Sequence, residues 1–210
     1  MRAIVFDCDG VLVDSEPAAE AAWTAVMALH GHTVTPLDLA PIRGTTTVDS
    51  YALLAASFPL AAYEDVVAEL DEALGREFET RLAAFPDAVE TVQRLAMRGL
   101  PLAVASSSRR SQLDAKLARF DLARYFDVTV AGDEVAAGKP APDLYLAAAA
   151  GLRIDPAACL AVEDAAAGAR AAASAGMRVV TVIRDAAIVE GFPAIDRLDA
   201  ALLLTWMGLE

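Results

Sequence analysis

The chain has 210 residues, of which 56% are hydrophobic. That is enough to bury the core of one ordinary domain, or of one domain that carries a smaller insert. Thirty acidic residues against 17 basic ones give a formal net charge of -13. Because this charge repels nucleic acid backbones and anionic membrane surfaces, we expect neither nucleic acid nor membrane as a partner.

The N-terminal sequence, the two cysteines and the apolar runs bear on where in the cell the protein is expected. The sequence begins MRAIVFDCDG, without a charged leader followed by a long apolar stretch, so we expect no signal peptide and a cytoplasmic location. Cys8 and Cys159 lie in or beside predicted strands and do not indicate a disulfide framework. Apolar runs such as Ala200–Leu204 are far shorter than the roughly 18 residues that cross a bilayer. We therefore expect no transmembrane span.

The first predicted strand is the apolar run Ala3–Phe6, and the interval that follows it breaks the strand pattern. Turn-forming residues mark the two junctions of this interval, at Asp14–Pro17 and at Pro86. Between them only helical patterns occur, at Ala18–Leu29, Val48–Ser57 and Tyr63–Leu82. We therefore predict a small α-helical domain at residues 16–85, inserted into a core formed by residues 1–15 and 86–210.

The remainder of the chain alternates short apolar runs with helical patterns. The runs, which we predict to be buried strands, are Pro101–Ala105, Val128–Ala131, Cys159–Val162 and Val179–Ile183. The helical patterns are Ala88–Met97, Ser111–Phe120, Leu144–Ala150 and Ala165–Ala175. Alternating strands and helices indicate an α/β fold with a Rossmann-like parallel sheet.

Polar side chains follow the predicted strands at their carboxyl ends, the edge where open parallel sheets collect ligands. They are Asp7, Asp9 and Gly10 after the first strand, Ser106, Ser107 and Ser108 after the second, Lys139 in the loop after the third, and Glu163 and Asp164 after the fourth. Four carboxylates so placed would repel one another unless a cation lay among them. Since oxygen ligands favour a hard ion, the sequence predicts Mg²⁺ as a cofactor.

The two aspartates after the first strand can do different work. A cation keeps Asp7 ionised as a nucleophile, whereas Asp9, held near it, can remain protonated and serve as an acid. Cys8 lies between them, so it faces the opposite side of its strand, and we expect a packed thiol.

Four motifs together resemble the haloacid dehalogenase superfamily: DCDGVLVDSE, the strand that ends in Ser106, the turn Gly138-Lys139-Pro140, and Val162-Glu163-Asp164. The resemblance covers nearly the whole chain. It includes a helical cap between the first two motifs, as in the β-phosphoglucomutase-like and phosphoglycolate phosphatase-like branch. It implies the fold of that superfamily, a small phosphorylated substrate, and a magnesium-dependent phosphatase that works through an aspartyl phosphate.

The resemblance also implies a role for each motif residue. Asp7 would attack the phosphoryl group, and Asp9 would protonate the leaving oxygen and later activate water. Ser106 would hydrogen-bond the phosphoryl oxygens, and Lys139 would neutralise charge on the nucleophile and the phosphate. The implied metal ligands are the side chain of Asp7, the backbone carbonyl of Asp9, Asp164, and Glu163 either directly or through water. Gly10 is expected to let the backbone turn so that neighbouring N–H groups face the phosphate.

Further residues are candidates for contacting the substrate: Gly10, Arg43, Gly44, Ser107, Ser108 and Arg109. In the branch that the chain resembles, the loop corresponding to Ile42–Thr46 approaches the leaving group, although an ordinary surface arginine explains Arg43 equally well. A basic residue at the start of a helix, such as Arg109, is unfavourable with the helix dipole and hints at a nearby anion. Ser108 is alternatively a cap for the helix that follows.

Other activities remain as alternatives. A mutase of the β-phosphoglucomutase type passes a proton through a cap histidine ten residues after the second aspartate, where this chain has Ala19. A phosphatase is therefore favoured. A dehalogenase lacks the second aspartate, so Asp9 argues against it. A non-catalytic phosphoacceptor would need neither Asp9 nor the insert, and a non-catalytic binding protein is disfavoured because none of the required polar positions has been lost. The sequence indicates no particular oligomeric state.

Overall fold

The computed structural model describes residues 1–42, 45–184 and 188–209. It divides into two compact units, one formed by Met1–Val13 with Ala84–Glu210 and the other by Asp14–Ala83. The chain passes between them at β2 (Val13–Asp14) and β3 (Ala83–Ala84), which pair as a two-stranded sheet. The insert that we expect at residues 16–85 differs from this division by two residues at each end.

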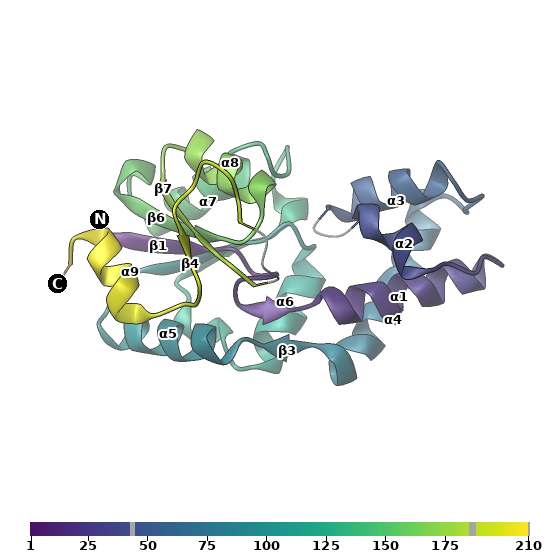
Figure 1. Cartoon of the computed structure of the whole chain (residues 1–210), viewed down its shortest axis with the longest axis horizontal. Coiled ribbons are helices and arrows are strands. Elements are labelled where there is room, and N and C mark those ends of the chain that lie inside the picture. The colour runs from purple at the N-terminus through teal and green to yellow at the C-terminus, as the bar shows by residue number, and fades with distance from the viewer. Residues whose placement is uncertain (43–44, 185–187, 210) are drawn as a thin grey trace. The chain divides into compact units, whose positions relative to one another are not determined.

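The first unit is built on a six-stranded sheet with the order β5-β4-β1-β6-β7-β8 (Figure 1). Its strands are β1 (Ala3–Phe6), β4 (Leu102–Ala105), β5 (Val128–Val130), β6 (Cys159–Glu163), β7 (Arg178–Val182) and β8 (Ala194–Ile195). All of these neighbours pair in parallel, and Phe6 of β1 lies opposite Val104 and Val162. Because the later strands are added on both sides of β1, its carboxyl end is the switch point where open α/β sheets bind ligands.

Helices cover both faces of this sheet. They are α5 (Pro86–Met97), α6 (Arg110–Arg119), α7 (Asp143–Leu152), α8 (Ala166–Ser174) and α9 (Ala200–Met207). Side chains alternate along a strand, and Ala3 and Val5 pack in one core cluster with residues of α7 and α8. Figure 1 shows α7 and α8 on one side of the sheet and α5 and α9 on the other. The strand β1 is therefore fully buried, and its carboxyl end is held rigidly in place.

The second unit is helical and has its own apolar core. It contains α1 (Glu16–Leu29), α2 (Pro36–Leu39), α3 (Thr47–Ala55) and α4 (Tyr63–Arg81). The buried residues of α1 and α4 recur at intervals of three and four, the spacing of one helix face, and α1 packs along α4. His30 ends α1, and its Nε2 lies 2.7 Å from Glu69 of α4.

The predicted fold class is confirmed, because each of the five predicted strands is present in the sheet. Among the strands of the six-stranded sheet and the α-helices that cover it, β8 and α9 were not predicted from the sequence. The strand β8 is only two residues long, and α9 (AALLLTWM) is apolar on nearly every side, so it lacks the 3.6-residue pattern. Its start is marked by Asp199, whose side chain accepts a hydrogen bond from the N–H of Leu202 at 2.9 Å.

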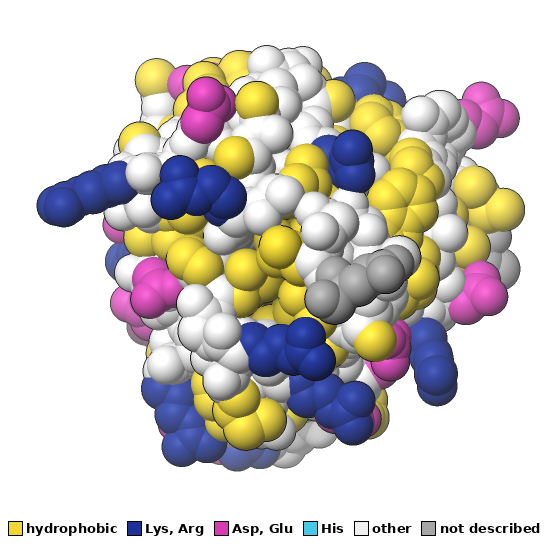
Figure 2. All heavy atoms as spheres, turned by 90° about the vertical axis from the view of Figure 1, so that its left-hand side faces the viewer, with side chains coloured by type: hydrophobic (Ala, Val, Ile, Leu, Met, Phe, Trp, Pro, Cys, Tyr) yellow, Lys and Arg dark blue, Asp and Glu magenta, His cyan; other side chains and the backbone are white. Residues whose placement is uncertain are grey.

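The surface shows no concentration of positive charge on the face drawn in Figure 2. Lys and Arg side chains lie scattered there among hydrophobic and uncharged atoms. None of the helices in the described part of the chain combines the length and the apolar character that a bilayer crossing requires.

Arg184, two residues after β7, joins three segments of the first unit. Its guanidinium donates to the carboxylate of Asp87 at 2.9 and 3.1 Å and to the backbone carbonyls of Gly10 and Val11 at 3.3 and 3.0 Å. It also lies over the ring of Phe85 at 3.9 Å. A planar guanidinium suits such a set of contacts, so Arg184 ties the loop after β1 to the start of α5.

We expect Arg184→Met to lower the free energy of unfolding by about 2 to 3 kcal/mol. The variant removes the guanidinium from two backbone carbonyls and from Asp87, which keeps only the N–H groups of Ala88 and Leu198 as donors. The matched control is Arg94→Met. The Arg94 side chain is 57% exposed, and this variant breaks its ion pair with Glu90. That variant should lose less than about 1 kcal/mol. Urea unfolding measures both, and equal losses would contradict the bracing role of Arg184.

Candidate active site

A buried ion-pair network lies where β1 and β6 end. Asp7 directly follows β1, and Lys139 donates to its Oδ1 and to Oε1 of Glu163, both at 2.6 Å. The side chains of Lys139, Asp7 and Glu163 are 7%, 10% and 1% exposed. Burial disfavours the Lys139 ammonium, but the two carboxylates outweigh this effect and raise the pKa of Lys139 above its ordinary value. The lysine therefore remains charged between two anions.

Glu163 is held by further donors. The hydroxyl of Tyr145 in α7 donates to Oε1 at 2.6 Å, and the N–H groups of Asp164 and Ala165 donate to Oε2 at 3.1 and 3.3 Å. Burial, reinforced by the nearby carboxylates, raises the pKa of Tyr145 well above its ordinary value, so the hydroxyl keeps its proton. With Lys139, four protein donors surround this carboxylate. Tyr145 was not among the residues predicted from the sequence.

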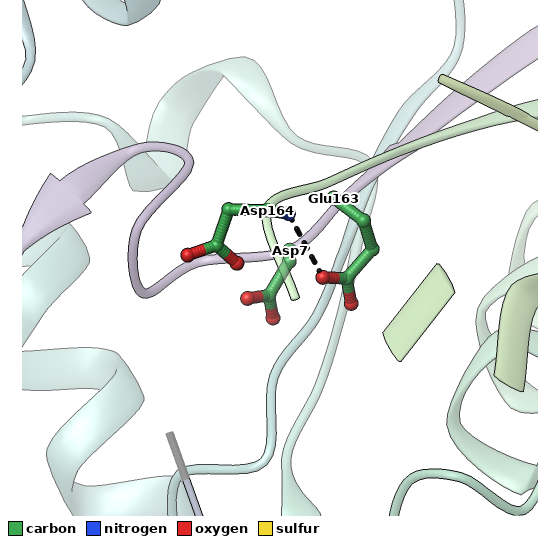
Figure 3. A group of neighbouring side chains, drawn as sticks. All are labelled: Asp7, Glu163 and Asp164. Carbon is green, nitrogen blue, oxygen red and sulfur yellow. Dashed lines mark hydrogen bonds between the residues drawn. The ribbon is translucent and has the colours of Figure 1, made fainter. Parts of the chain in front are cut away.

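Asp7, Glu163 and Asp164 form a group of three carboxylates. Figure 3 shows them gathered where β1 and β6 end, and they offer oxygen atoms that all lie within 4.8 Å of one another. Burial raises the pKa of Asp7 to about 7, an effect that Lys139 opposes and Glu163 supports. Burial, together with repulsion from Asp7 and Glu163, raises the pKa of Asp164 to about 8. The group therefore carries more negative charge than the protein alone stabilises.

Two glycines allow the acidic side chains to fit. Gly10 has a φ of 76°, and a Cβ there would lie 1.8 Å from Oδ2 of Asp164. A Cβ on Gly168 of α8 would lie 1.7 Å from Oε1 of Glu163. The N–H of Gly10 donates to the carbonyl of Val13 at 2.8 Å. Gly10 thus has a second reason to be glycine, beyond the tight turn that the sequence predicts.

The carboxylate of Asp9 lies in a different set of contacts. Its Oδ2 accepts hydrogen bonds from the hydroxyls of Ser108 at 2.9 Å and Ser106 at 3.5 Å. Its Oδ1 accepts from Nζ of Lys116 at 2.5 Å, and Nζ also donates to the Ser108 hydroxyl at 2.7 Å. The structure thus brings together three predicted site residues and one, Lys116, that was not predicted. Because an adjacent ammonium favours the charged form of a carboxylate, this arrangement does not favour the protonated Asp9 that we expected.

The remaining candidates for substrate contact are placed differently. Ser108 does not cap α6, because the residue at the N-cap is Arg109 and the Ser108 hydroxyl binds Asp9. Ser107 and Arg109 are half-buried. Arg110, the next residue, forms ion pairs with Glu134 and Asp114. Arg43 and Gly44, the other two candidates, lie outside the described residues.

The donors at this edge of the sheet fit a divalent cation. Four carboxyl groups (Asp7, Asp9, Glu163 and Asp164) face two ammonium groups (Lys116 and Lys139), so two negative charges remain in the site when all four are ionised. All of the available ligands are hard oxygen atoms. The raised pKa values of Asp7 and Asp164 show the same excess of negative charge.

Comparisons with known proteins agree with this geometry. Residues 1–176 match the family model of the haloacid dehalogenase-like hydrolases. The chain belongs to this family. A phosphorylated carbohydrates phosphatase from Thermotoga maritima is 32% identical over 178 residues, which cover 84% of this chain and 82% of that protein. Two Escherichia coli relatives are also named phosphatases.

Another relative, the chloroplastic SUPPRESSOR OF QUENCHING 1 protein of Arabidopsis thaliana, is 34% identical over 95% of this chain, but the chain spans only 20% of its length. Among solved structures, CbbY from Rhodobacter sphaeroides in complex with phosphate has a TM-score of 0.85 and 27% identity, covering 94% of this chain and 95% of that one. A mutant of the same protein was solved with xylulose-(1,5)bisphosphate. A Thermotoga maritima protein assigned as a β-phosphoglucomutase has a TM-score of 0.80 and 28% identity, and the match covers both chains fully.

We expect Gly168→Ala to destabilise the protein by about 1 to 3 kcal/mol, because the added methyl group overlaps Glu163. The matched control is Gly75→Ala in α4, where a Cβ meets nothing within 4 Å. Since alanine is the better helix former, that variant should gain up to about 1 kcal/mol. Thermal unfolding compares the two, and a neutral Gly168→Ala would show that Glu163 has room to move.

The pKa shifts predict how stability depends on pH without metal. The pKa of Asp7 and that of Asp164 lie above the ordinary 3.8, so the folded chain binds more protons than the unfolded chain between about pH 4 and pH 8. In EDTA, the Tm should therefore fall as the pH rises through this window. Because a divalent cation would bind the ionised carboxylates, we expect added Mg²⁺ to raise the Tm more at about pH 8 than at about pH 5.

Asp164→Asn serves as the control for this experiment, because it removes one of the two shifted groups and should flatten the pH dependence measured in EDTA. Differential scanning calorimetry measures both effects. A gain in Tm from Mg²⁺ that is the same at every pH would contradict the link between the carboxylates and the metal.

Proposed function

We propose that the chain hydrolyses the phosphate monoester of a small sugar-like metabolite, with Mg²⁺ as its cofactor and an aspartyl phosphate on Asp7 as the intermediate. The observation that carries the proposal is the buried network in which Lys139 holds Asp7 beside Glu163 and Asp164. The substrate class is supported by the name of the Thermotoga phosphatase and by the phosphate and sugar bisphosphate bound to CbbY.

Asp7 is the nucleophile in this proposal. Its Oδ1 is fixed by Lys139 at 2.6 Å, which leaves Oδ2 to attack phosphorus in line with the leaving oxygen. Phosphoryl transfer depends mainly on positioning and on positive charge around the transferring oxygens. Lys139 supplies one such charge, and Ser106, fully buried at the end of β4, supplies a hydroxyl beside the same site.

Asp9 moves the protons. As the bond between phosphorus and the leaving oxygen breaks, Asp9 gives that oxygen its proton. The resulting carboxylate then takes a proton from water, whose oxygen attacks the phosphorus of the aspartyl phosphate, releasing inorganic phosphate and Asp7. The acid role requires Asp9 to be protonated when the substrate binds, although the ion pair with Lys116 favours the ionised form.

The residues that would hold Mg²⁺ are the side chains of Asp7 and Asp164 and the backbone carbonyl of Asp9. We assign Glu163 a contact through water, because four protein donors already occupy its carboxylate. When bound, Mg²⁺ supplies positive charge that offsets the charge of the carboxylates and of the phosphoryl oxygens.

The helical insert that we predict at residues 16–85 acts as the cap in this proposal and selects the substrate. We assign contacts with the substrate to Arg43 and Gly44 from the insert, and to Gly10, Ser107, Ser108 and Arg109 from the core. Selection by a cap allows one catalytic core to serve several metabolites, because the phosphoryl site and the specificity site belong to different segments.

The proposal is tested with p-nitrophenyl phosphate. Wild-type protein should release p-nitrophenol in Mg²⁺ and not in EDTA, and Asp7→Asn should abolish turnover because an amide does not attack phosphorus. Asp9→Asn should lose about 10²- to 10⁴-fold while still binding metal. Asp155→Asn, a carboxylate that caps a turn before β6, is the control and should remain active. Turnover by Asp7→Asn equal to that of wild type would refute the covalent mechanism.

A sugar-phosphate mutase is the second candidate, favoured by the likeness to the β-phosphoglucomutase assignment. Against it stands Ala19 of α1, at the position where the mutases of this branch have a histidine. Quantifying inorganic phosphate and isomerised sugar phosphate from one substrate separates the two activities. A phosphatase releases one phosphate for each substrate consumed, whereas a mutase releases almost none.

A further inference from the structure

We propose that Lys116 is a positioning residue that, together with Ser108, fixes the carboxylate of Asp9 for proton transfer to the leaving group. The inference rests on the proposed function, in which Asp9 is the acid and base. It adds a residue that none of the four sequence motifs contains.

The geometry holds both oxygens of Asp9 from different elements. Lys116 of α6 reaches Oδ1 at 2.5 Å, whereas Ser108, in the loop after β4, reaches Oδ2 at 2.9 Å. Nζ of Lys116 also donates to the Ser108 hydroxyl at 2.7 Å, which closes a triangle of polar contacts. A carboxylate bound through each oxygen in this way cannot rotate about its terminal bond without losing a partner.

A lysine at this position of α6 is otherwise unfavourable. Leu113 and Leu117, three residues before it and one after it, are fully buried, and the Lys116 side chain is only 6% exposed. A charged group on such an apolar face is costly unless it is paired. An aliphatic side chain would pack there without this cost, so the contacts with Asp9 and Ser108 account for the lysine.

The two buried lysines bind different aspartates. Lys139 binds Asp7 and Glu163, at the metal side of the site. Lys116 binds Asp9, at the side of Ser108. Each aspartate therefore has its own ammonium, and a change at Lys116 should affect proton transfer and leave the nucleophile in place.

This separation gives a specific kinetic expectation. Proton transfer to the leaving oxygen matters more for phenyl phosphate than for p-nitrophenyl phosphate, because phenolate is the poorer leaving group. Removing the ammonium also makes Asp9 easier to protonate, and we expect the loss of a fixed orientation to outweigh this gain. Lys116→Met should therefore lower kcat/KM for phenyl phosphate by about 10- to 100-fold, and for p-nitrophenyl phosphate by several-fold at most. Lys116→Arg, which keeps the charge, should recover a large part of the loss.

The decisive measurement is a double-mutant cycle with Asp9→Asn. If Lys116 acts through Asp9, adding Lys116→Met to Asp9→Asn should change kcat/KM by less than about twofold. The matched control is Arg110→Gln, which breaks an ion pair at the start of the same helix and should not alter the ratio between the two substrates. Circular dichroism and Tm establish that each variant is folded. If Lys116→Met does not fold, Lys116→Gln, which removes the charge but keeps a polar side chain, is used for the same comparison.

Equal losses on both substrates, or an additive loss in the Asp9→Asn background, would overturn the positioning role and make Lys116 a structural residue. Failure of the proposed function looks different. In that case wild-type protein would show no Mg²⁺-dependent turnover of either ester, or Asp7→Asn would remain active.

Discussion

Repulsion among carboxylates where β1 and β6 end is the constraint on which the rest of the site depends. Asp7, Glu163 and Asp164 lie within one cation's reach, and two of them are buried. The chain relieves part of this repulsion with Lys139, with the Tyr145 hydroxyl and with backbone N–H groups. The repulsion that remains lowers the stability of the metal-free protein, and a divalent cation bound to these oxygen atoms would offset it.

The fold makes this arrangement possible because β1 is packed rigidly on both sides. The strand β1 is buried between β4 and β6, and α7 and α8 pack closely against one face of the sheet. Close packing in turn requires small residues, and the glycines at positions 10 and 168 are where the acidic side chains occupy the space that a Cβ would take. Catalytic geometry and core packing are therefore set by the same residues.

The sequence predicts the parallel sheet and an acidic cluster at one of its edges, with Asp7, Ser106 and Glu163 at neighbouring strand ends, because the carboxyl ends of parallel strands meet at the same edge. It does not reveal Tyr145 or Gly168, since their roles depend on how α7 and α8 lie over β6. Lys116 had a visible signal, a lysine at the spacing of the buried leucines of α6, but its partner Asp9 is 107 residues away. Contacts of that kind follow from the packing of helices on the sheet, which local patterns do not encode.

The pairing of β2 with β3 has a consequence for how such proteins diversify. It brings the two ends of the segment Asp14–Ala83 together as neighbouring strands, next to the loop that carries Asp9 and Gly10. The segment between β2 and β3 can therefore be replaced by one of another length or fold without moving the sheet, provided that the ends of the new segment also pair as neighbouring strands. Because we propose that the insert selects the substrate, we expect a chimaera that carries a relative's insert to keep the chemistry of the core and to take on the donor's choice of substrate.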